Sequence, residues 1–168
     1  MADVFGILNA GSSSIKFSLF TDREGELVAG ARGQVEGLYT APRFVAKAPD
    51  GTKLAEKAWG EGEAIGHDGG LMHVAAYLRE AMAGDRFAGV GHRVVHGGLD
   101  HTRPVRVDAA LVKSLERFVP LAPLHQPHNL TPIRLLLERQ PGLPQVACFD
   151  TSFHRTAPPV SQRFAIPQ

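Results

Sequence analysis

Residues 9–17 read Asn-Ala-Gly-Ser-Ser-Ser-Ile-Lys-Phe, and this stretch decides the fold of the first part of the chain. Apolar residues lead into it, and Ile15, Phe17 and Leu19 lead out of it at period two, as a half-buried strand requires. Small residues in the turn let the backbone approach a ligand closely, and successive N–H groups and three hydroxyls can then point at one anion. The pattern predicts a strand–turn–strand hairpin that binds phosphate.

A lysine follows this turn at a position that suits anion binding. Lys16 alternates with its apolar neighbours, so its side chain shares a strand face with Ser14 and Ser18. The P-loop pattern Gly-x4-Gly-Lys-Ser/Thr is absent, and a strand follows where that motif needs a helix. An ordinary polar hairpin turn is the alternative interpretation, and the turn by itself does not decide between the two.

Composition limits the classes of protein to consider. The 168 residues are 43% hydrophobic, which is enough for one domain with a core. With 18 basic and 17 acidic residues, the chain has no general attraction to nucleic acid. Cys148 is the one cysteine, which excludes an internal disulfide and suits a reducing cytoplasm. No targeting pattern opens the sequence and no apolar run approaches the ~18 residues of a membrane span, so we expect a cytoplasmic protein without a membrane partner.

Periodicity predicts an α/β protein. Alternating apolar residues predict strands over 3–9, 15–21, 26–33, 43–48, 52–58, 87–95 and 145–149. Helical spacing predicts helices over 69–83, 108–118 and 131–140. Asp108 is the expected cap of the second helix, and the pair Thr131-Pro132 is the expected start of the third. Hairpin strands followed by alternating helices and strands indicate a mixed β-sheet with flanking helices.

Residues 89–98, Gly-Val-Gly-His-Arg-Val-Val-His-Gly-Gly, carry a strand into a double-glycine turn. His92 and His96 have the spacing of some zinc-binding helices, but on a strand they lie about 13 Å apart, which disfavours a shared metal. Arg93 at the strand end is a natural two-point clamp for a carboxylate or phosphate. A structural salt bridge is the alternative role for this arginine.

Residues 121–129, Leu-Ala-Pro-Leu-His-Gln-Pro-His-Asn, predict a rigid, proline-pinned loop that opens a helix. Its polar atoms lie where a ligand can reach them. The alternative is a simple helix entry capped by Asn129 or Thr131.

Residues 146–154, Val-Ala-Cys-Phe-Asp-Thr-Ser-Phe-His, end an apolar strand on an acid. A carboxylate just past the carboxyl end of a buried strand lies where α/β sheets place their ligands. Asp150 is therefore a candidate for orienting a metal ion or a reacting group, with a helix-capping or turn aspartate as the alternative.

Taken together, these segments resemble the acetate kinase family. Residues 9–16, 91–98, 120–125 and 149–154 are similar to four family segments and occur in the family's order. Propionate kinases share these motifs. Butyrate kinases are a more distant match, because they carry a Pro and a Thr in the first segment where this chain has Ala10 and Ser13.

The resemblance implies the acetate and sugar kinase/Hsp70/actin fold, which is ribonuclease H-like. In that fold two related domains close on ATP, Mg²⁺ and a short carboxylate, and the implied reaction is ATP + acetate ⇌ ADP + acetyl phosphate. The resemblance assigns these side chains: Asn9 to Mg²⁺, Ser12, Ser14 and Lys16 to the nucleotide phosphates, Arg93, Val95 and Leu124 to acetate, and His125 and Asp150, with Arg93, to catalysis. Because a carboxylate nucleophile with a pKa of about 4–5 is already ionised near pH 7, we favour Asp150 as an aligner of Mg²⁺ or of Arg93 over a proton acceptor.

The resemblance also implies a domain organisation. The chain is less than half as long as a usual family member, so residues 1–150 are expected to form the N-terminal, actin-like domain and residues 151–168 to begin a second one. We then expect little activity from the chain alone and a homodimer for the full-length protein. The alternative is a non-catalytic module that binds phosphate or carboxylate and pairs with another chain.

Overall fold

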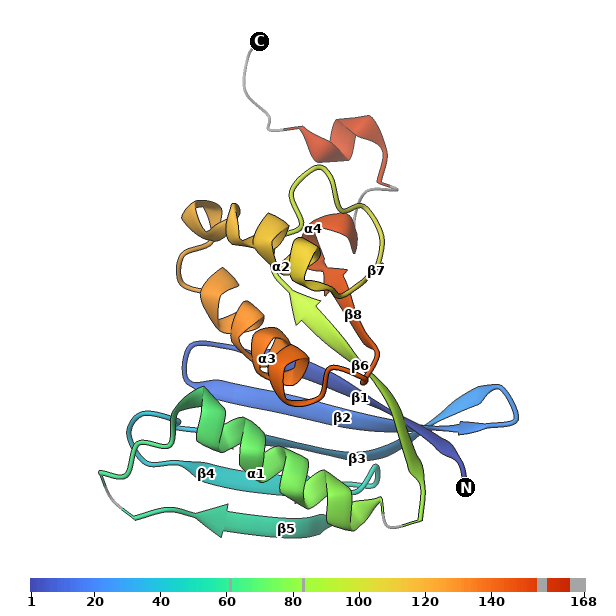
Figure 1. Ribbon diagram of the computed structural model, residues 1–168, viewed down its shortest axis with the longest axis vertical. Helices are drawn as coiled ribbons and strands as arrows, with labels where there is room; N and C mark the ends of the chain where they lie inside the picture. The colour runs from blue at the N-terminus through green and yellow to red at the C-terminus, as the bar shows by residue number, and fades with distance from the viewer. Residues whose placement is uncertain (61, 83, 154–156, 164–168) are drawn as a thin grey trace.

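The computed structural model describes residues 1–60, 62–82, 84–153 and 157–163 (Figure 1). Its strands are β1 (Asp3–Ala10), β2 (Ser14–Arg23), β3 (Glu26–Glu36), β4 (Arg43–Lys47), β5 (Lys53–Ala58), β6 (Arg86–Val94), β7 (Val105–Arg106) and β8 (Gln145–Phe149). Its helices are α1 (Gly66–Ala81), α2 (Ala109–Glu116), α3 (Gln126–Arg139) and α4 (Asp150–Phe153), with 3-10 turns η1 (Val119–Leu121) and η2 (Pro159–Gln162).

The strands form one mixed sheet in the order β5-β4-β3-β2-β1-β6-β8-β7. The pairs β1/β6 and β6/β8 are parallel, whereas β1 to β5 are joined by antiparallel pairs. Parallel neighbours need a crossover, and α1 provides the connection before β6 while α2 and α3 provide the one before β8. The expected mixed sheet with flanking helices is confirmed.

Alternation along the strands separates two faces of the sheet. Ile15 and Phe17 are buried against α1 in a core that also contains Leu71 and Val74 of that helix. A second core joins β6 and β8 to α2 and α3. Figure 1 shows α1, α2 and α3 on the same side of the sheet. Side chains of the opposite parity, such as Lys16, therefore point away from these helices.

Two helices begin earlier than the sequence predicts. The predicted start of α3 at Thr131-Pro132 is wrong, because α3 begins at Gln126 with Pro127 in its first turn. Thr131 lies inside the helix and its hydroxyl donates to the carbonyl of Pro127, so neither it nor Asn129 caps the helix. The start of α1 lies at Gly66 instead of residue 69, since its first turn lacks the apolar spacing.

The other predicted elements are found within a few residues of their expected bounds. Asp108 caps α2 as predicted, and its carboxylate accepts a hydrogen bond from the Leu111 amide at 2.7 Å. Short elements without a periodic signal were not predicted, namely β7, α4 and the two 3-10 turns. Of the segment 151–168, residues 154–156 and 164–168 lie outside the described residues.

Candidate active site

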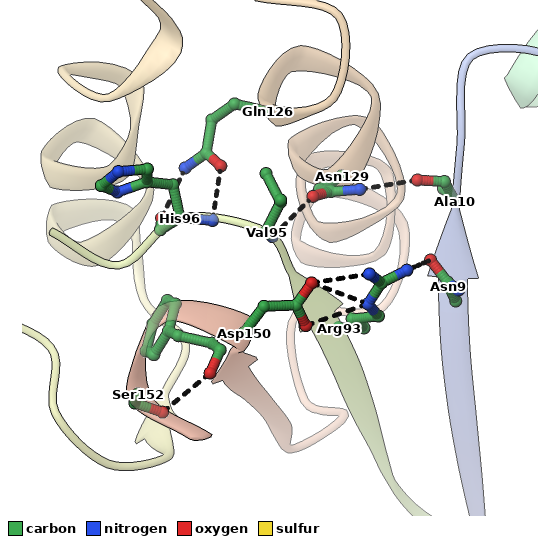
Figure 2. A network of polar contacts seen from close by, with 10 residues as sticks. Asn9, Ala10, Arg93, Val95, His96, Gln126, Asn129, Asp150 and Ser152 are labelled. Carbon is green, nitrogen blue, oxygen red and sulfur yellow. Dashed lines mark hydrogen bonds and ion pairs between the residues drawn. The ribbon is translucent and has the colours of Figure 1, made fainter. Parts of the chain in front are cut away.

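Three strands end together in the parallel part of the sheet, and a polar side chain stands at each end. β1 carries Asn9 at its next-to-last position, β6 carries Arg93 likewise, and Asp150 directly follows β8. The Asp150 carboxylate accepts bonds from Arg93 Nε at 2.9 and 3.0 Å and from Nη2 at 2.6 Å. Arg93 Nη1 lies 3.4 Å from Asn9 Oδ1 (Figure 2). Residues far apart in sequence thus form one polar cluster.

The ion pair in this cluster is two-pronged and reached by solvent. The Arg93 and Asp150 side chains are 54% and 38% exposed. Hydrogen bonding to Asp150 raises the pKa of Arg93 further above its ordinary value, so the guanidinium is a permanent cation. Arg93 and Asp150 also line a groove of about 390 Å³ with Cys148, Phe149 and Phe153. A small anion has access to the arginine there.

The serine turn lies at the end of β1, as the sequence predicts. The Gly11 amide donates to the Ser14 carbonyl at 2.8 Å and closes a tight hairpin. Ser12 and Ser13 are exposed, and their amides donate no hydrogen bond to any residue that the structure describes. Lys16 stands directly opposite Asn9 in the antiparallel register and is exposed. Free N–H groups and a cation therefore stand beside the cluster, an arrangement suited to a phosphate.

Two buried amides on α3 hold the backbone of neighbouring segments, and neither role is apparent from the sequence. Asn129 accepts from the Val95 amide at 2.8 Å and donates to the Ala10 carbonyl at 2.6 Å (Figure 2). Gln126 exchanges hydrogen bonds with both backbone groups of His96. The sequence carries no clear signal for them, because both residues precede the predicted start of the helix at residue 131.

The remaining predicted site residues lie near the helix entry. Val95 is half-buried just past the end of β6, where its backbone is held by Asn129. Leu124 and His125 occupy the exposed turn before α3, and Leu124 is 73% exposed. Among the described residues, no hydrogen bond or ion pair joins Leu124 or His125 to the cluster.

Oxygen atoms dominate the ligand set available for a cation. Asn9 offers an amide oxygen and Asp150 a carboxylate, which are the hard donors that Mg²⁺ prefers alongside water and phosphate. No group of three His, Cys, Asp or Glu side chains that could hold a metal is found in the described ranges. His92 bonds to Gln145, and His96 accepts from the Gly98 amide. The residues present therefore fit Mg²⁺ shared with a phosphate better than a protein-enclosed metal.

Comparisons with known proteins agree on one kind of relative. The model of the acetokinase family matches residues 4–168. The acetate kinase of Nitrobacter hamburgensis is 50% identical over 163 residues, 96% of this chain and 40% of that protein. The acetate kinase of Rhizobium meliloti is 43% identical over 166 residues, 99% of this chain and 42% of that protein. The chain thus spans about two fifths of the length of these curated relatives.

Solved structures give the same picture. A propionate kinase from Francisella tularensis superposes with a TM-score of 0.79 at 32% identity, covering 98% of this chain and 41% of that one. The Porphyromonas gingivalis acetate kinase superposes with a TM-score of 0.76 at 30% identity, covering 99% of this chain and 42% of that one. In the described part of the chain, no helix is long and apolar enough to cross a membrane.

Proposed function

Because this chain belongs to the acetokinase family, we propose that it provides the phosphate turn and the carboxylate clamp of an acetate kinase. Its fold is the expected acetate and sugar kinase/Hsp70/actin type. The reaction proposed for the whole protein is reversible transfer of a phosphoryl group from ATP to acetate. The observation that carries the proposal is the joining of Asn9, Arg93 and Asp150 beside the serine turn.

Arg93 is the proposed binding residue for the acetate carboxylate. Its Nε and Nη2 atoms hold Asp150, so the Nη1–Nη2 edge remains for a second carboxylate. Asp150 keeps the guanidinium plane in one orientation. This aligning role suits a reaction whose carboxylate nucleophile is already ionised and needs no proton acceptor. We propose that Val95 and Leu124 line the pocket for the acetate methyl group.

The serine turn and Lys16 are the proposed contacts of the nucleotide phosphates. Phosphoryl transfer requires alignment of the reacting groups and neutralisation of the phosphoryl oxygens more than covalent help. Ser12, Ser14 and Lys16 provide hydroxyls and a cation, and His125 is the residue proposed to act near the transferring group. When bound, Mg²⁺ supplies further charge neutralisation, with Asn9 and Asp150 as the residues that would hold it.

Two alternatives have specific support. Propionate kinase is the first, since a matched structure carries that name. An apolar pocket distinguishes two substrates that differ by one methylene by only ~1–3 kcal/mol. A non-catalytic phosphate- or carboxylate-binding module that pairs with another chain is the second, because the exposed serine turn and Arg93 offer contacts for an anion by themselves.

We also propose the organisation of the whole protein. Residues 1–150 form its N-terminal domain and residues 151–168 begin the second one, a boundary that lies one residue after the end of β8 and within α4. We propose a homodimer that acts in the cytoplasm without nucleic acid, which agrees with a net charge of +1.

A chimera tests the function directly. This chain replaces the matching segment of the Nitrobacter hamburgensis acetate kinase, and acetyl phosphate formed from ATP, Mg²⁺ and acetate is trapped with hydroxylamine. We expect turnover by the chimera and almost none by its Arg93→Ala variant. Arg86→Ala is the matched control, because Arg86 forms an ion pair with Asp3 elsewhere on the sheet. A folded but inactive chimera, or full activity of Arg93→Ala, would refute the proposal.

A further inference from the structure

Two consecutive backbone carbonyls precede the exposed serines, and each accepts a hydrogen bond from a buried side chain. Asn129 Nδ2 donates to the Ala10 carbonyl at 2.6 Å, and His67 Nε2 donates to the Gly11 carbonyl at 2.7 Å. The donors come from α3 and α1, which are separate helices. They are only 6% and 5% exposed, so water does not compete freely for either bond.

The far end of each donor is fixed as well. The Asn129 amide oxygen accepts from the Val95 amide at 2.8 Å. The Tyr39 hydroxyl lies 2.8 Å from His67 Nδ1. Because a carbonyl only accepts, His67 must carry a proton on Nε2, and in the neutral ring Nδ1 then accepts from the tyrosine. The His128 ring stacks on His67 with centroids 5.2 Å apart. Neither donor can turn away without breaking a second contact.

This arrangement determines which groups of the turn remain available. The amides of Ser12 and Ser13 have no partner in the described chain, and the Gly11 carbonyl held by His67 shares its peptide plane with the Ser12 N–H, which therefore points the opposite way. An anion is attracted by such N–H groups and repelled by carbonyl oxygens. We propose that Asn129 and His67 are positioning residues that keep the carbonyls of Ala10 and Gly11 turned away from a bound phosphate. This inference rests on the proposed phosphate binding by the serine turn.

Asn129 has a second consequence for the reaction. One amide group holds the end of β1, which leads into the serine turn, and the backbone of Val95, two residues after Arg93. Beyond the direct pairing of β1 with β6, this buried side chain is therefore a further link between the phosphate turn and the carboxylate clamp. Rates of transfer between two bound groups are sensitive to their separation.

The test uses the 168-residue chain, with inorganic pyrophosphate and Mg²⁺ as the probe and the amide NMR signals of Ser12 and Ser13 as the readout. Asn129→Asp keeps the oxygen that accepts from the Val95 amide, but it replaces the amide nitrogen so that a second oxygen faces the Ala10 carbonyl. His67→Leu removes the donor to Gly11, whereas His67→Gln keeps an N–H at a similar reach. Gln126→Glu is the matched control, since it makes the same amide-to-acid change in a buried residue of α3 that does not contact the turn.

We expect Asn129→Asp and His67→Leu to weaken pyrophosphate binding by about tenfold, in line with the loss of one buried hydrogen bond. His67→Gln should restore binding to within about threefold of the wild type, because its amide replaces the donor. Gln126→Glu should lower the unfolding midpoint without changing pyrophosphate affinity. A loss of affinity in all four variants in proportion to their loss of stability would overturn the positioning role.

A readout without any ligand separates this inference from the proposed function. Through-hydrogen-bond coupling between His67 Nε2 and the Gly11 carbonyl carbon reports the contact in the free chain, and its absence overturns the inference. Wild-type affinity in Asn129→Asp and His67→Leu overturns the inference and leaves phosphate binding intact. A wild-type chain that ignores pyrophosphate while showing the coupling overturns the phosphate role of the turn, and the proposed role of both side chains with it.

Discussion

Arg93 turns its Nε–Nη2 edge toward Asp150, with Nε 2.9 Å from Oδ1 and Nη2 2.6 Å from Oδ2. This side-on geometry differs from a pairing through the two terminal nitrogens, because it leaves the outer edge of the guanidinium for another carboxylate. A salt bridge and a substrate clamp were alternative interpretations of Arg93 in the sequence. The geometry makes them compatible, since one arginine has donors for both.

Asp150→Asn tests the dependence of the clamp on this pair. The variant keeps the shape but loses the charge, so Arg93 is held less firmly and we expect the acetate titration midpoint, followed on the Arg93 Nε–H signal, to rise about tenfold. Stability should change by less than ~1 kcal/mol, because the pair is largely exposed to solvent. Asp3→Asn breaks a comparable pair with Arg86 and should leave acetate binding unchanged. Equal acetate midpoints for Asp150→Asn and wild type would contradict the aligning role.

Lys16→Gln tests the cation beside the serine turn. Lys16 is exposed, so its removal should cost little stability while weakening pyrophosphate binding by about tenfold at low salt. Added KCl should reduce the difference between variant and wild type, since salt screens exposed charges. Lys47→Gln removes another exposed lysine, which lines the same groove as Lys16. If both substitutions weaken pyrophosphate binding equally, the effect comes from the overall positive charge of this groove and not from Lys16 in particular.

The sequence predicts well those parts of the site that depend on local patterns. The alternation of Ile15, Lys16 and Phe17 places the lysine on the correct face, and the apolar strand before Asp150 places that carboxylate at the sheet edge. Both inferences need only the geometry of a single strand.

The contacts that join distant segments could not be predicted in this way. Asn129 bonds to Ala10 across 119 positions of sequence, and nothing near either residue indicates the other. The first turn of α3 is polar and contains a proline, so its helical periodicity begins only at the next turn. It forms a helix because Gln126 and Asn129 bond to the backbone of the neighbouring loop and strand.

Gly98→Ala tests the loop that follows the clamp. Gly98 has φ of +64°, and a Cβ atom there would overlap the Phe118 ring. Backbone strain and overpacking together should lower the free energy of unfolding by about 2–4 kcal/mol, which urea unfolding can measure. Gly142→Ala is the control, because nothing lies within 4 Å of its Cβ position, and it should change stability by less than ~0.5 kcal/mol. Similar unfolding midpoints for both variants would show that the loop adjusts to the side chain.

His92 should make the protein less stable in mild acid. Its buried ring links β6 to β8, with Nε2 2.8 Å from Gln145 Oε1, and burial lowers the pKa of His92 from 6.5 to about 4. Below about pH 6.5 the unfolded chain therefore binds a proton on His92, whereas the folded chain binds it only below about pH 4. Stability from this group is complete above the unfolded pKa and is lost as the pH falls through this window, by at most about 3 kcal/mol. The double variant His92→Leu/Gln145→Leu replaces both buried polar groups and should lose this part of the pH dependence. Urea unfolding between pH 7 and pH 4.5 measures the difference, and parallel pH profiles for the two proteins would show that His92 is not the group responsible.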